Sequence, residues 1–133
     1  MKILEQLLMA FRNKKNKKKK KLEGLQALKS VCGRNIKVYN ALLGILLLNG
    51  PSSLISFEEC IRKAKAYETG NRQQAAIWYR LAAQRALFEG NREEVERCLR
   101  KCEELTSEKQ LILTVLEKAV AKAQEYYKKV PRA

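Results

Sequence analysis

The residues of this chain whose types and spacing could do chemistry are the cations between Phe11 and Leu22. Eight of these ten residues are Lys or Arg, and none is acidic or apolar. They are Arg12, Lys14, Lys15, Lys17, Lys18, Lys19, Lys20 and Lys21. Because like charges at this density repel one another and cannot be buried, we expect the run to bind a polyanion or to stay solvated. Phosphate backbones and anionic lipid surfaces are the polyanions that a cell offers.

The positive charge is concentrated toward the N-terminus. Residues 1–50 contain 12 Lys and Arg against Glu5 and Glu23, whereas residues 51–133 contain 16 against 12 Glu. Such a basic segment is typical of nucleic-acid-binding proteins. Because Lys is a point charge without the forked geometry of Arg, we expect it to grip phosphates without reading sequence. A solubilising tail is the alternative that the charge pattern leaves open.

An amphipathic segment precedes the lysine run. Its apolar residues fall on one helical stripe: Ile3, Leu4, Leu7, Leu8 and Phe11. A stripe followed by lysines also resembles a peripheral membrane anchor. We favour docking on protein, because the polar face carries Glu5 and Gln6 instead of cations. With no signal-peptide pattern and no apolar stretch of the ~20 residues that a bilayer span needs, we expect a cytoplasmic protein without a membrane partner.

Acid–base or nucleophilic catalysis is not indicated. The chain contains no His and no Asp, and all 14 acidic residues are Glu. His and Asp are frequent members of catalytic constellations. Here the Glu residues stand beside Lys and Arg at helical spacings, where they act as ion-pair partners. No glycine-rich phosphate loop or metalloprotease motif is present, so we predict a protein without catalytic residues and without a cofactor.

The cysteines Cys32, Cys60, Cys98 and Cys102 are the other candidate site. Cys98 and Cys102 are four residues apart, a spacing that fits poorly with the C-x₂-C knuckles of zinc sites. They continue an apolar stripe with Leu99 on one helical face, which favours core packing because free Cys is among the most buried residue types. A disulfide or a metal site is the minor alternative, and we predict no metal ligands.

Trp78 and Tyr79 are adjacent aromatic residues in an Ala-rich segment, with Arg72, Arg80 and Arg85 nearby. They could stack on a splayed base that the arginines hold. Packing of one ring in the core and of the other against a neighbouring helix is the interpretation that we favour.

Apolar periodicity predicts an all-α chain of about five to six helices. The expected ranges are about 22–32, 35–48, 57–69, 72–88, 92–105 and 107–129. Short turns make consecutive helices antiparallel neighbours, so we predict helical hairpins behind a lysine-rich N-terminal extension. A winged helix over residues 36–69 would need a recognition helix next, and the segment after it is too apolar for a groove.

Capping residues and glycines mark the predicted starts and ends of the helices. Capping boxes are expected at Ser56, Asn71, Asn91 and Ser107, each with Glu or Gln three residues later. Stops are expected at Gly33, Gly70 and Gly90. The stretch from Gly70 to Ala75 and the stretch from Gly90 to Val95 follow the same pattern, so the helices after them should begin alike.

Part of the chain resembles a tetratricopeptide repeat. The turn glycine and the small–aromatic–small positions of that family's second helix are matched by Gly70, Ala75, Tyr79 and Ala82. The resemblance covers about half of one ~34-residue repeat and implies stacked helical hairpins that bind other proteins. The chain departs from the pattern upstream, where Glu59 and Lys63 replace a bulky aromatic and a small residue, and its internal offset is 20 residues.

These patterns predict a division of the chain by charge. Residues 1–33 form an amphipathic and polybasic extension, residues 34–129 a helical-hairpin domain, and residues 130–133 a tail. We expect a non-enzymatic, nucleic-acid-binding subunit of a larger nucleoprotein assembly, with RNA slightly favoured over DNA. A protein-interaction adaptor with tetratricopeptide-like hairpins is the alternative, and a peripheral membrane-surface protein is the third.

Overall fold

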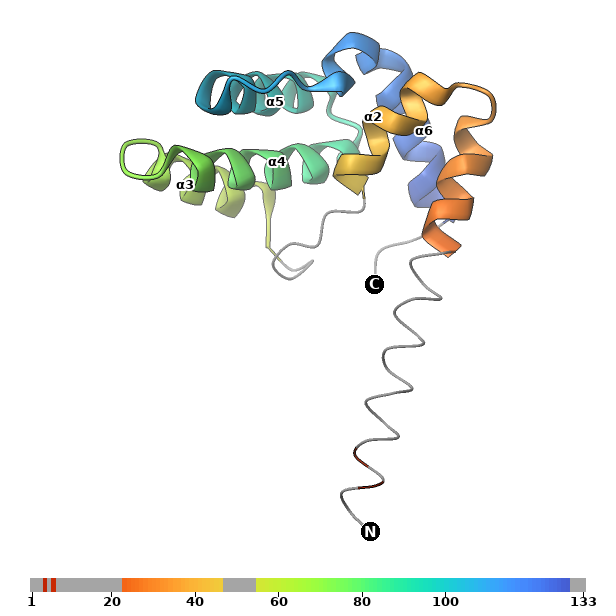
Figure 1. Ribbon diagram of the computed structural model, residues 1–133, viewed down its shortest axis with the longest axis horizontal. Coiled ribbons are helices and arrows are strands. Elements are labelled where there is room, and N and C mark those ends of the chain that lie inside the picture. Colours follow the sequence, from red (N-terminus) through yellow and green to blue (C-terminus); the bar gives the residue numbers. More distant parts are fainter. Residues whose placement is uncertain (1–3, 5, 7–22, 47–54, 130–133) are drawn as a thin grey trace.

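The computed structural model describes residues 4, 6, 23–46 and 55–129, and within them the regular structure is entirely helical (Figure 1). Residues 23–32 are helical. The elements after them are α2 (Ile36–Leu46), α3 (Phe57–Tyr67), α4 (Arg72–Glu89), α5 (Arg92–Thr106), the 3₁₀ helix η1 (Leu111–Val115) and α6 (Leu116–Lys129). The all-α prediction is therefore confirmed for the described residues.

Three predicted N-caps are present at the starts of α3, α4 and α5. The side-chain oxygens of Ser56, Asn71 and Asn91 accept hydrogen bonds from the backbone N–H groups three residues later, at Glu59, Gln74 and Glu94. Each bond satisfies one of the amides that the first turn of a helix leaves without a helical partner.

Two of the three predicted glycine stops adopt the left-handed conformation. Gly33 has a φ of 58° and Gly90 a φ of 73°. Gly70 does not have a positive φ, because α3 already ends at Tyr67 and residues 68–70 form a turn. The helices that follow Gly70 and Gly90 therefore begin alike, but the helices that precede these glycines end differently.

The predicted capping box at Ser107 is wrong. Ser107 has a φ of 63° and closes α5, its backbone N–H donating to Glu103 O at 2.8 Å. It thus occupies the left-handed position that glycine usually fills. The next helical segment begins after Gln110 without a side-chain cap and becomes α-helical only at Leu116.

Helix α4 lies at the centre of the described fold. It packs against α3 and α5, and it also contacts α2 and α6 (Figure 1). Small buried residues on α4 allow this close approach: Ala75, Ala82, Ala83 and Ala86. The remaining helices form a second group, in which α2 packs against η1 and α6. Leu28 of the 23–32 helix is fully buried in the same core.

Hydrogen bonds from two glutamine side chains hold α2 and α6 against α4. The buried Gln84 donates from Nε2 to Ile45 O at 3.0 Å, at the C-terminal end of α2. Gln124 of α6 donates from Nε2 to Phe88 O at 3.0 Å, at the C-terminal end of α4. The last carbonyls of a helix have no helical partner, so each of these bonds satisfies one such carbonyl.

Candidate nucleic-acid interface

The residues that the sequence predicts to bind phosphates lie outside the described residues. They are Arg12, Lys14, Lys15, Lys17, Lys18, Lys19, Lys20 and Lys21. Of the predicted docking stripe, Ile3, Leu7, Leu8 and Phe11 are outside as well. Leu4 is described: it is helical, and its relative exposure is 67%, so it is not part of the core.

The described part of the chain carries its own charge asymmetry. Residues 55–110, which include α3, α4 and α5, contain eleven cations and ten Glu residues. Residues 23–46 and 111–129, which form the other group of helices, contain seven cations and three Glu residues. Most of the net positive charge of the described residues therefore lies on residues 23–46, which follow the lysine run in sequence, and on residues 111–129, whose helices pack against α2.

Carboxylates neutralise several cations of α3 and α5. Along the helices, Arg62 pairs with Glu59, Arg97 with Glu94 and Arg100 with Glu96. These pairs are three or four residues apart and partly exposed, so they stabilise the surface weakly. Their main consequence is electrostatic, because a paired guanidinium attracts a phosphate less than a free one does.

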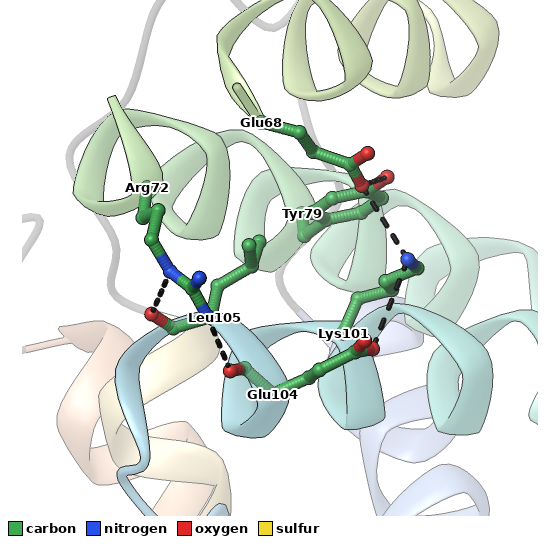
Figure 2. A network of polar contacts seen from close by, with 6 residues as sticks. All are labelled: Glu68, Arg72, Tyr79, Lys101, Glu104 and Leu105. Atoms are coloured by element: carbon green, nitrogen blue, oxygen red, sulfur yellow. Dashed lines mark hydrogen bonds and ion pairs between the residues drawn. The ribbon is translucent and has the colours of Figure 1, made fainter. Parts of the chain in front are cut away.

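A network of polar contacts links α3, α4 and α5 (Figure 2). Lys101 Nζ lies 3.5 Å from Glu68 Oε1 and 3.7 Å from Glu104 Oε2. Arg72 donates from Nε to Leu105 O at 3.2 Å and from Nη2 to Glu104 O at 3.0 Å. Arg72 thereby places positive charge at the C-terminus of α5, where the helix dipole is negative.

The second group of helices presents cations without such partners. Lys29, Arg34, Lys37 and Lys128 form no ion pair with a carboxylate of any described residue. The end of α6 lies against the 23–32 helix, where Lys129 Nζ donates to Ser30 Oγ at 3.3 Å (Figure 1). The sequence does not predict this contact, because residues 23–32 and 128–129 are far apart in the chain and neither stretch is unusual in charge alone.

The adjacent aromatic residues of α4 are not an open stacking platform. Tyr79 has only 4% of its surface exposed. Trp78 packs partly against the core, and Lys63 Nζ lies 4.9 Å from the centroid of its ring. The packing interpretation of this pair is therefore confirmed, with Lys63 covering one ring by a cation–π contact.

The four cysteines are buried and free, as core packing requires. Their relative exposures are 5% or less. Burial raises the pKa of the Cys98 thiol and of the Cys102 thiol to about 12 each. Cys102 Sγ donates to Ala76 O at 3.3 Å, which ties α5 to α4. Protonated thiols in these positions are poor nucleophiles and poor metal ligands.

Comparison of the chain with protein-family models, with curated proteins and with solved structures finds no match. Functional assignment therefore rests on the charge distribution and on the contacts described above. None of the described helices combines the length and the apolar character that crossing a membrane requires.

Proposed function

We propose that this protein is a non-enzymatic, nucleic-acid-binding subunit of a larger nucleoprotein assembly. The observation that carries the proposal is the concentration of charge: eight cations within residues 12–21, followed by helices that carry seven cations against three Glu residues. Such a distribution gives affinity for a phosphate backbone without sequence readout, because Lys offers a point charge to any phosphate.

RNA is the slightly favoured nucleic acid. Small, very basic chains without His and with a lysine-rich extension resemble ribosomal proteins in general, and this chain has a formal net charge of +14 at pH 7. A DNA replication or chromatin complex is the nearest alternative. Either setting implies a cytoplasmic or other intracellular location and no catalytic role or cofactor.

The rest of the chain would serve the assembly through protein contacts. In this proposal residues 34–129 are a domain of helical hairpins, residues 130–133 are a tail, and the apolar stripe of residues 3–11 docks on a protein subunit. The exposed Leu4 supports a stripe that is available to a partner. Leu7→Glu combined with Leu8→Glu should release the protein from its assembly while phosphate binding persists.

Purification of the tagged protein from its native cell, with and without nuclease, tests the proposal. We expect nuclease treatment to remove the co-purifying proteins other than the subunit that the stripe of residues 3–11 contacts, because phosphate contacts through the lysine run would hold the rest of the assembly. Survival of the same protein partners after complete digestion would contradict it and would favour an adaptor. Salt-resistant binding to neutral liposomes, lost in the Leu7→Glu/Leu8→Glu variant, would favour the membrane-surface interpretation instead.

The second candidate function is a protein-interaction adaptor with tetratricopeptide-like helical hairpins. It is favoured by large apolar side chains that α4 leaves at the surface, since Ile77 is 50% exposed and Phe88 is 42% exposed. Exposed apolar residues in a protein with this much charge are candidate contacts for a partner. In that case the lysine run would only keep the protein soluble.

A further inference from the structure

Arg80 of α4 lies between two hollows of the described surface. The larger has a volume of about 560 Å³ and is bounded by α4, the end of α5 and residues 106–110. The smaller has a volume of about 180 Å³ and is bounded by α2, Arg80 and residues 108–112. Arg80, Glu108 and Gln110 line both, so the guanidinium stands where the two hollows meet. The larger volume falls within the range of small-molecule sites.

The guanidinium of Arg80 has unused hydrogen-bonding capacity. Its Nε is buried, and no acceptor of a described residue lies within hydrogen-bonding distance of it. Buried donors without a partner are uncommon in native proteins and therefore call for an explanation. A guanidinium can bind two oxygens of one anion through a pair of neighbouring N–H groups.

Charge around the two hollows favours an anion. Three cations line them, Arg72, Arg80 and Lys109, against the single carboxylate of Glu108. Arg72 is already engaged with the carbonyls at the end of α5, where it offsets the negative helix terminus (Figure 2). The nearby carboxylate of Glu103 accepts a hydrogen bond from Gln110 N at 3.0 Å. The residues that line the hollows therefore carry a net charge of +2, which attracts a dianion more strongly than a monoanion.

The walls supply apolar surface beside this charge. Ile77 and Leu105 line the larger hollow, and Leu111 lines the smaller one. Ile77 and Leu111 are 50% and 57% exposed, so the packing of the described residues leaves them accessible. On α2, a Cβ added at Gly44 would lie 3.7 Å from Arg80 Nη2, so α2 borders the guanidinium.

We propose that the hollows at Arg80 bind a phosphate monoester, with two phosphoryl oxygens on the Arg80 guanidinium and the ester's planar or apolar body against Ile77 and Leu105. A phosphate monoester is close to a dianion at pH 7. None of the residues that line the hollows belongs to the lysine run, so the proposal goes beyond the proposed function and does not depend on it.

Phenyl phosphate is the probe for this site, because it joins a phosphoryl group to a planar apolar body. The Arg Nε–Hε resonances of the ¹⁵N-labelled full chain would be followed by NMR during a titration. We expect a saturable shift of the Arg80 resonance, identified by its loss in Arg80→Lys, with a Kd below about 1 mM. The Arg62 resonance, from an exposed arginine away from the hollows, should not move.

Two variants and one control test the contacts. Arg80→Lys keeps the charge but loses the fork, and Ile77→Asp adds a negative charge at an exposed wall; each should raise Kd at least about tenfold. Arg62→Lys should leave Kd unchanged. If circular dichroism shows that Arg80→Lys does not fold, the Kd of Ile77→Asp tests the proposal instead. Position 77 is half exposed and tolerates a polar residue.

Several results would contradict the proposed phosphate-binding site. They are the absence of a saturable Arg80 shift, an equal shift at Arg62, or benzoate binding as tightly as phenyl phosphate does. Substitution of residues 17–21 by Gln should leave phenyl phosphate binding intact. Loss of binding in that variant would assign the affinity to the lysine run and would also overturn the proposal.

Discussion

The hydroxyl of Tyr79 donates a hydrogen bond to Glu68 Oε1 at 2.5 Å, which joins the middle of α4 to the turn that follows α3. The same oxygen of Glu68 lies 3.5 Å from Lys101 Nζ on α5 (Figure 2). One carboxylate thus links three helices. The hydrogen bond from Tyr79 and, secondarily, the charge of Lys101 lower the pKa of Glu68, whereas burial and this carboxylate raise the pKa of Tyr79.

This contact should make stability depend on pH in the acid range. The pKa of Glu68 is lower in the folded chain than in the unfolded one, so its contribution is complete above the unfolded value of about 4.3. It is lost as the pH falls through the lower, folded value. Tyr79→Phe should reduce the free energy of unfolding by about 1 kcal/mol at pH 7 and by less near pH 3.

Urea unfolding of wild type and Tyr79→Phe at both pH values measures this difference. Tyr67→Phe is the matched control, since Tyr67 is 41% exposed, and it should change stability little at either pH. A loss in Tyr79→Phe of equal size at both pH values would assign the effect to packing and not to the carboxylate.

The two cysteines of α5 should be unreactive in the folded protein. Cys98 and Cys102 are each 1% exposed, and burial raises the pKa of both thiols to about 12. Because the thiolate is the reactive form, a disulfide reagent at pH 8 should label these cysteines only after denaturant is added. Cys98→Ala should lower the free energy of unfolding by about 1–2 kcal/mol. Rapid labelling of Cys98 or Cys102 in the native protein would contradict their place in the core.

Gly44→Ala should stabilise the protein. Gly44 lies within α2, and an added Cβ would meet only Arg80 Nη2, at the ordinary contact distance of 3.7 Å. Replacing a mid-helix Gly by Ala removes backbone freedom from the unfolded chain, so we expect a gain of about 0.5–1 kcal/mol in chemical denaturation. Gly33→Ala is the contrasting control, because its φ of 58° strains any L side chain, and it should destabilise. Destabilisation by Gly44→Ala would show that the guanidinium of Arg80 cannot accommodate even a methyl group.

Local features of this fold were predictable from the sequence, and features built across helices were not. Asn71 and Asn91 cap the helices that follow them because the interaction spans only three residues. Ser107 shows the limit: the same polar pattern can begin a helix or end one, and the chain uses it to close α5 in the left-handed conformation.

The hollows at Arg80 could not be predicted from the sequence. Their lining residues come from α2, α4, the end of α5 and residues 106–112, so the site exists only once these segments pack. From the sequence, Arg80 was a candidate only as one of three arginines that could hold a base stacked on Trp78 and Tyr79. By contrast, the lysine run is recognisable without a fold, because its chemistry depends on charge density alone.

The salt dependence of RNA binding tests whether the lysine run binds phosphates. Binding of a mixed-sequence RNA hairpin would be measured as log K against log salt for wild type and for the variant with residues 17–21 changed to Gln. A matched variant with Lys63, Lys65, Arg92, Arg100 and Lys109 changed to Gln removes the same charge from residues 55–110, where cations and Glu residues nearly balance. We expect the first variant to flatten the slope by about 4 and the second to change it much less. Equal slopes in the two variants, or binding that does not depend on salt, would contradict a phosphate-gripping role for the lysine run.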